Sequence, residues 1–430
     1  MYDSLRGIFV SFLVLAALTA GSTSVQAAGM TTIQELADMI RQQQKQLQRQ
    51  QQKMQALQSK LDALVRQNLR SQSAAAAMPA KEENKIVLSR DDRLQLTVKG
   101  HVNRAVMLTS DGNQTDAFHV DNDTEPTLIN FTGTVAATGD LTIGAQFEVQ
   151  LASNASNAVS QVTENASTGS ISFAERHLEV FFDSKSFGKL SLGQGNTASE
   201  GTSETDLSGT NVVVRSNFGT FGGGILFRNS TTNALSAVSI GSVFNNFDGL
   251  SRDDRVRYDT PNFGGFMVSG SWLQGGATDL ALRYSASFGG ADFASSIAAA
   301  NTGSTSTTVG ETYNASASLL LENGLNFTLA GGVRNFKAST SSDSEFLYGK
   351  LGYQFSPFKI GKTAFSFGYA SQDNLAASGD EADFFAIGAT QRLDEWATEL
   401  YAGFRQYYLD RPGSSFDDVS ITMFGAMVTF

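Results

Sequence analysis

The chain has 430 residues and a formal net charge of −11 at pH 7, which argues against nucleic acid as a partner. It contains no cysteine, which excludes disulfide bridges, thiolate metal sites and thiol nucleophiles. Its 41 Gly, 31 Phe and 10 Tyr suit short strands whose two faces meet lipid and water. The composition therefore favours an all-β protein.

The first 27 residues have the pattern of an export signal. Arg6 precedes an apolar stretch from Ile8 to Ala20, and a small-residue cleavage pattern ends at Ala27. A retained transmembrane helix is the alternative, but the stretch is shorter than the roughly 20 apolar residues that cross a bilayer. No later run reaches that length, so membrane residence after export would require a closed barrel. We therefore predict a signal peptide over residues 1–27.

Residues 30–70 have the heptad pattern of a coiled-coil helix. Apolar residues fill eight of the ten seam positions: Ile33, Leu36, Ile40, Leu47, Met54, Leu57, Leu61 and Leu64. Such a narrow apolar stripe is buried only against copies of itself or a partner. Gln43 and Gln50 fill the other two seam positions, so a disordered Gln-rich spacer is the alternative. The pattern does not determine how many helices associate in the coiled coil. Residues 71–90, which follow the helix, are expected to form a linker.

Residues 91–430 divide into segments of about 8 to 14 residues with a period of two, a length that suits tilted transmembrane strands. In residues 141–151, for example, Leu, Ile, Ala, Phe, Val and Leu alternate with polar residues or glycine. Counting such segments predicts a barrel of sixteen antiparallel strands. The last strand ends at Phe430, the expected recognition signal for the barrel-assembly machinery.

Connections between these segments alternate between tight turns and long polar loops, as in outer-membrane barrels. The third long loop, at about residues 196–254, is too long for a simple hairpin. Residues 218–227 and 235–244 could form additional strands within it, so a barrel of eighteen strands is the alternative.

Strand parity assigns a set of charged side chains to the lumen. If Val256 and Tyr258 face lipid, then the residues between and beside them face inward. The same argument assigns these basic residues to the lumen: Lys99, Lys189, Arg255, Arg257, Arg283, Arg334, Lys350, Arg392 and Arg405. The inward acids are fewer: Glu148, Glu179, Asp259 and Glu399. Arg104 stays ambiguous because the alternation breaks beside it.

The third loop carries acidic residues that could face this basic wall across a constriction: Glu200, Glu204 and Asp206. Such a transverse field, with guanidinium groups replacing water around a small dianion, would favour anions. The alternative is an unselective pore in which opposite charges on adjacent strands simply pair.

Four segments resemble the Gram-negative trimeric porin family, in the order in which that family has them. They are residues 94–102 (LQLTVKGHV), 129–133 (INFTG), 187–193 (FGKLSLG) and 257–266 (RYDTPNFGGF). The chain departs from the family at Gln194, where Arg is common. The constriction is therefore expected either to be less positive at that point or to carry another Arg that substitutes for the missing one. The resemblance spans about residues 94–430.

The resemblance implies a homotrimeric, water-filled diffusion channel of sixteen strands, narrowed by its third loop. It places the barrel in the outer membrane, in contact with lipid and lipopolysaccharide, and the N-terminal helix in the periplasm. A coiled coil before such a barrel is similar to the DcaP-like porins, a subgroup associated with small dicarboxylates. The channel is expected to pass small hydrophilic solutes with a preference for anions. No cofactor or metal is expected.

Other functional classes fit the sequence less well. An enzyme would need a base beside a nucleophile, but His101, His119 and His177 are the only histidines and no motif surrounds them. An envelope tether or adhesin, in which the coiled coil is the working part, is the second alternative. It does not account for a chain with strands enough for a complete barrel.

Overall fold

The computed structural model describes residues 86–89, 93–166, 172–338 and 341–430. The predicted signal peptide (1–27), the predicted coiled coil (30–70) and nearly all of the predicted linker (71–90) lie outside the described residues. The first described element, β1 (Ile86–Ser89), pairs antiparallel with β2 (Leu94–Ser110).

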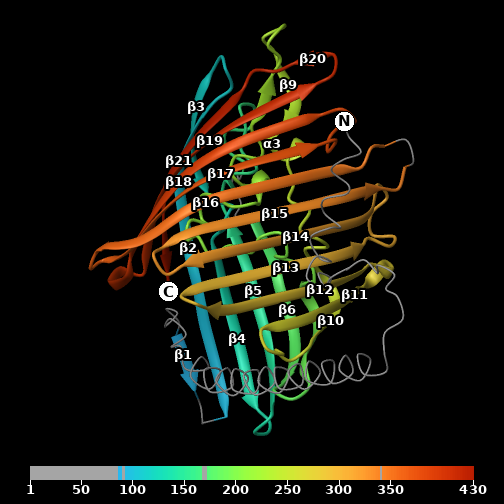
Figure 1. Cartoon of the computed structure of the whole chain (residues 1–430), viewed down its shortest axis with the longest axis vertical. Coiled ribbons are helices and arrows are strands. Elements are labelled where there is room, and N and C mark those ends of the chain that lie inside the picture. Colours follow the sequence, from blue (N-terminus) through green and yellow to red (C-terminus); the bar gives the residue numbers. More distant parts are fainter. Residues whose placement is uncertain (1–85, 90–92, 167–171, 339–340) are drawn as a thin grey trace, which may run out of the picture. The chain divides into compact units, whose positions relative to one another are not determined.

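Within the described part of the chain, sixteen antiparallel strands close a β-barrel (Figure 1). The sheet has nineteen strands, of which three are short additions: β1, β3 (Thr115–Asp121) and β20 (Ser414–Ser415). The first and last barrel strands, β2 and β21 (Val419–Thr429), pair from His101↔Thr429 to Ser110↔Ser420 and close the ring. The prediction of sixteen strands is confirmed, and the alternative of eighteen is wrong.

The strands between β2 and β21 follow each other around the barrel in chain order. They are β4 (Leu128–Ala136), β5 (Leu141–Ala152), β6 (Ser172–Ser184), β7 (Gly188–Asn196), β10 (Arg252–Asp259), β11 (Phe266–Leu273), β12 (Thr278–Phe288), β13 (Ala291–Asn301), β14 (Val309–Leu321), β15 (Leu325–Phe336), β16 (Ser344–Phe358), β17 (Gly361–Asp373), β18 (Glu381–Leu393) and β19 (Thr398–Arg411).

Each strand separates an apolar outer face from an inner face of small or polar residues, because successive side chains point to opposite sides of a strand. On β17, Phe365 and Phe367 are 48% and 49% exposed on the outside, whereas Ser366 and Ala370 are buried on the inside. An exposed row of aromatic and aliphatic side chains is the surface that a bilayer requires.

Tight turns join the strands at one end of the barrel, and longer loops join them at the other. The turn between β14 and β15 requires glycine at position 324. Gly324 has a φ of +92°, and a Cβ there would lie 1.8 Å from the carbonyl oxygen of Gln354. At the opposite end, β3 folds back on the second half of β2.

The third loop occupies residues 197–251, between β7 and β10, close to the predicted range. It contains η1 (Phe218–Thr220), β8 (Leu226–Arg228), β9 (Leu235–Ser239) and α3 (Ile240–Val243). β8 and β9 pair only with each other, so they form a separate hairpin rather than additional barrel strands. No helix among the described residues is long and apolar enough to cross a membrane.

Candidate functional site: the barrel lumen and its third loop

The first part of the third loop is fixed by hydrogen bonds to the inner faces of β12 and β14. Ser199 donates to the Asp279 carboxylate from its backbone N–H (2.8 Å) and its hydroxyl (2.5 Å). The Thr202 hydroxyl donates to Asn314 Oδ1 at 2.6 Å. All four residues are buried, so these polar groups satisfy one another away from water.

Lys350 on β16 joins the middle of the loop to the wall. Its fully buried ammonium group forms an ion pair with Asp206 and donates to Ser208 Oγ (2.6 Å) and the Val214 carbonyl (2.8 Å). Strand parity predicted that Lys350 points inward, but the loop encloses it. Lys350 therefore holds the loop against the wall through Asp206 and does not line an open channel, which corrects the predicted role of Lys350.

An aromatic cluster fixes the following part of the loop. Phe218 is fully buried, and its ring centroid lies 5.1 Å from that of Phe384, 5.7 Å from that of Phe346 and 5.8 Å from that of Tyr348. These three partners project from β18 and β16. Aromatic pairs at such separations add to the stabilisation that burial of their area already provides.

Two predicted pore-lining arginines also lie against this cluster. Arg405 is 1% exposed, donates to the carbonyl oxygen of Val213 at 3.1 Å and stacks over the ring of Phe221 at 4.4 Å. Arg334 lies over the ring of Phe247 at 4.4 Å. Arg405 thus anchors the loop rather than lining the channel, which corrects its predicted role.

The inner face of β4 to β7 differs from this packed side. The apolar cluster formed by the loop and the wall contains no described residue from β4, β5, β6 or β7. Polar side chains cover this face instead, and Arg176 donates to Glu148 (2.9 Å) and Gln150 (3.0 Å). The third loop is therefore packed on one side of the lumen.

Most inward charges on this face and on adjacent β10 are paired with each other. Arg255 forms a buried ion pair with Glu179, and Arg257 pairs with Asp259 at 2.7 Å. Val256, between the two arginines, is exposed on the outer face, as strand parity predicts. Four of the predicted lumen charges are therefore brought together as two neutral pairs.

The acids of the third loop pair with arginines that sequence reasoning missed. Glu200 pairs with Arg252 at the start of β10, and Glu204 pairs with Arg215 of the same loop. Arg215 also pairs with Glu125 at 2.9 Å. These contacts compensate charges that were predicted to face the basic wall across the lumen.

The remaining predicted basic residues lie on the inner wall. Lys189 has its ammonium group 4.3 Å from the Phe181 ring centroid. Arg283 donates at 2.8 Å to the carbonyl oxygens of Ala198 and Glu200, so it supports the start of the third loop. Lys99 is partly buried on the first half of β2.

Two residues left open by the sequence face outward. Arg104 follows the parity of exposed Val102 and pairs with Asp121 at 3.7 Å. Gln194 is paired in the sheet with Leu178, which is exposed on the outer face. Because Gln194 faces outward, glutamine in place of the expected arginine does not change the charge of the lumen. At the end of the chain, Phe430 exchanges two backbone hydrogen bonds of 2.9 Å with Gly100.

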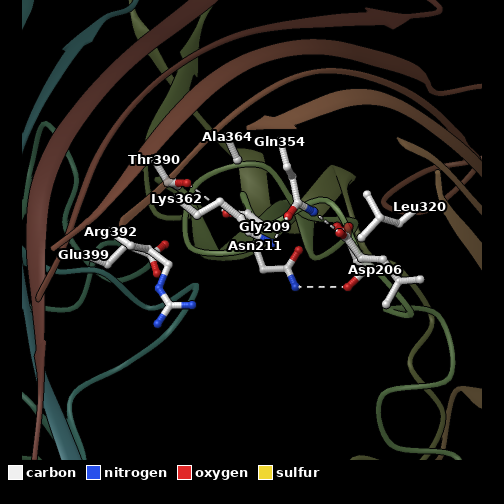
Figure 2. A pocket seen from close by; sticks show the side chains of 11 residues that line it. Asp206, Gly209, Asn211, Leu320, Gln354, Lys362, Ala364, Thr390, Arg392 and Glu399 are labelled. Atoms are coloured by element: carbon white, nitrogen blue, oxygen red, sulfur yellow. Dashed lines mark hydrogen bonds between the residues drawn. The ribbon is translucent and has the colours of Figure 1, made fainter. Parts of the chain in front are cut away.

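A pocket of about 320 Å³ lies beside loop residues 206–211, near the tight-turn end of the barrel (Figure 2). Arg392 and Glu399 line it, together with Lys362, which strand parity had not singled out. Figure 2 shows the Arg392 guanidinium projecting into the open space. Arg392 also pairs with Asp394 at 3.1 Å.

The segment that returns the loop to β10 contains Asp248, a titratable residue that joins this segment to the start of the loop. Its carboxylate accepts hydrogen bonds from the backbone N–H groups of Gly201 (2.6 Å) and Ser203 (3.0 Å). Burial, followed by the nearby carboxylates of Glu204 and Glu200, raises the pKa of Asp248 to about 7. The folded loop therefore binds a proton that the unfolded chain releases at a lower pH.

We expect the third loop to be held less tightly as pH rises. The pKa of Asp248 is higher in the folded loop than the value of 3.8 in the unfolded chain, so protonation stabilises the folded loop. This stabilisation is fully present below pH 3.8 and is lost as the pH rises toward 7. Proteolysis of the loop should accelerate from pH 4 to pH 8 relative to Asp248→Asn, which lacks this titration. Asp254→Asn, an exposed acid on β10, should behave like the wild type. Equal pH profiles for the wild type and Asp248→Asn would contradict this role.

Comparisons with known proteins agree with this geometry. The family model described as Gram-negative porin matches residues 63–411. Among solved structures, the anion-selective porin from Comamonas acidovorans is 14% identical, with 78% of this chain and 100% of that chain covered and a TM-score of 0.53. Outer-membrane expressed OmpT of Vibrio cholerae is 12% identical, with 80% and 100% covered and a TM-score of 0.51.

The outer membrane channel DcaP of Acinetobacter baumannii also matches, at 12% identity, with 80% of this chain and 99% of that chain covered and a TM-score of 0.48. A search of curated proteins gave no match. At these identities, the two structures with TM-scores above 0.5 establish a shared fold.

Proposed function

The chain belongs to the Gram-negative porin family, and we propose that it forms a passive diffusion channel for small hydrophilic solutes, with a preference for anions. The observation that carries this proposal is the one-sided packing of the third loop. The loop covers the inner wall from β12 to β21 and the second half of β2, while polar and charged side chains cover β4 to β7. Solutes would cross along that polar wall.

The anion preference rests on basic side chains that are not neutralised by an acid. Within the described ranges, Lys189, Arg283 and Lys362 form no ion pair. Arg283 donates to two uncharged carbonyl groups and so keeps its net positive charge beside the loop. Uncompensated cations along a narrow path favour anions. Because most other charges pair, we propose a modest preference rather than strict selectivity.

Family membership and the sequence support a proposal for the assembly. We propose a homotrimer in the outer membrane, in contact with lipid and lipopolysaccharide and inserted by the barrel-assembly machinery through the strand that ends at Phe430. The tight turns would face the periplasm, as short turns do in outer-membrane barrels. The N-terminal coiled coil would stabilise the trimer on that side.

We expect Lys189→Gln to shift the reversal potential under a KCl gradient toward cation selectivity, because it removes a positive charge from the polar wall. Planar-bilayer recording measures this shift. Lys185→Gln is the matched control, since Lys185 lies in the tight turn before β7 and donates to the Gly139 carbonyl. An unselective wild-type channel, or equal shifts from both variants, would contradict the proposed anion preference while leaving the channel itself intact.

A further inference from the structure

The pocket beside loop residues 206–211 presents positive groups from two neighbouring strands. Lys362 on β17 uses one of its three N–H donors on Gln354 Oε1, at 3.0 Å. Arg392 on β18 pairs with Asp394, but its side chain remains 34% exposed. Both cations therefore keep donors for a ligand. At about 320 Å³, the pocket lies at the small end of the range for small-molecule sites.

The same pocket also presents acceptors without partners. Asn211 Oδ1 is buried and has no hydrogen-bond partner among the described residues. Glu399 lies directly across the sheet from Arg392 and forms no ion pair of its own in the described chain. The other acid of the pocket, Asp206, is already paired with Lys350. A buried acceptor without a donor is costly, so a ligand with N–H groups would satisfy Asn211.

The charges of the pocket are balanced. Lys362 and Arg392 contribute two positive charges and Glu399 contributes a negative one. Asp394, which is not part of the lining, pairs with Arg392 and supplies the second negative charge, and the pair of Lys350 and Asp206 is neutral. A dianion would meet the Glu399 carboxylate, which has no ion-pair partner among the described residues, whereas a solute that carries both charges would find a partner for each. Leu207, Leu320 and Ala364 add an apolar part to the lining.

We propose that this pocket binds a small α-amino acid zwitterion. Its carboxylate would take donors from Lys362 and Arg392, and its ammonium group would donate to Glu399 and Asn211. The small side chain would lie against the apolar part. If the pocket binds a solute transiently during permeation, that role depends on the proposed channel function. Binding of the amino acid itself does not depend on it.

Saturation-transfer NMR with the full chain in detergent tests the proposal, with L-alanine as the probe. Its trimethylated betaine, which has no N–H donor, should bind at least about tenfold more weakly, because it leaves Asn211 and Glu399 without hydrogen bonds. Acetate and succinate, which lack the ammonium group, should also bind more weakly than alanine. Equal binding of alanine and its betaine, or tighter binding of succinate, would overturn the proposal.

Variants separate the two halves of the site. Glu399→Gln should weaken alanine about tenfold and leave acetate unchanged, whereas Lys362→Met should weaken both. Lys359→Met, in the exposed turn before β17, is the control and should change neither. If Glu399→Gln leaves alanine binding unchanged, the zwitterion site is excluded. Binding without bilayer conductance would refute the channel and keep the site, and conductance without binding would do the reverse.

Discussion

Replacing Lys350 with Met is expected to free the middle of the third loop and to raise single-channel conductance. The substitution leaves the Asp206 carboxylate, 3% exposed, without its only ion-pair partner among the described residues. Breaking one half of a buried ion pair typically costs about 3–5 kcal/mol. It also removes the donors to Ser208 and the Val214 carbonyl. A loop that no longer fits the wall should sample wider openings, which planar-bilayer recording would detect.

The double variant Lys350→Met/Asp206→Asn is the matched control for that experiment. Removing both charges leaves no unpaired ion in the interior, so much of the lost stability should return. Conductance in the double variant should therefore move back toward the wild-type value. If Lys350→Met alone has wild-type conductance and wild-type protease resistance in the loop, then Lys350 does not anchor the loop.

The second large effect is expected from Phe218→Ala. Phe218 is fully buried and touches four rings, with the edge contact to Phe244 completing the set described above. Replacing a buried Phe with Ala typically costs about 3–5 kcal/mol, because the transfer energy is lost and a cavity remains. Limited proteolysis should cut the third loop much faster in this variant, while the barrel itself stays folded.

Phe367→Ala is the control for the aromatic cluster. Phe367 lies on β17 but points outward, where its side chain is 49% exposed. In detergent, the loss of this ring should leave the protease sensitivity of the third loop unchanged. Equal cleavage rates in Phe218→Ala and the wild type would mean that the aromatic cluster does not hold the loop.

The barrel could be predicted from the sequence because the alternation of side chains is local. On β17, the aromatic residues 365 and 367 alternate with small or polar ones, and the pattern follows directly from the pleat of a strand. The long connection at residues 197–251 could also be recognised by its length alone. Both features depend only on neighbours in the chain.

The environment of the inward charges could not be predicted in the same way. Parity gives the direction of Lys350 and Arg405, but whether they meet water depends on loop residues more than a hundred positions away. Arg176 was missed because the register shifts between Glu148 and Val149, which makes Arg176 the extra residue on β6 and turns it inward. Arg215 lies in the loop, where no period applies.

The most direct test of the one-sided lumen uses the absence of cysteine in the chain, which allows single thiols to be introduced. Gln146 lies partly exposed on the inner face of β5, and Ala370 lies fully buried on β17 beneath the loop. In conducting channels, we expect a charged methanethiosulfonate to react with Gln146→Cys and change the current, and to leave Ala370→Cys unmodified. Rapid modification of Ala370→Cys, or no reaction at Gln146→Cys, would contradict a water-filled path beside a fixed third loop.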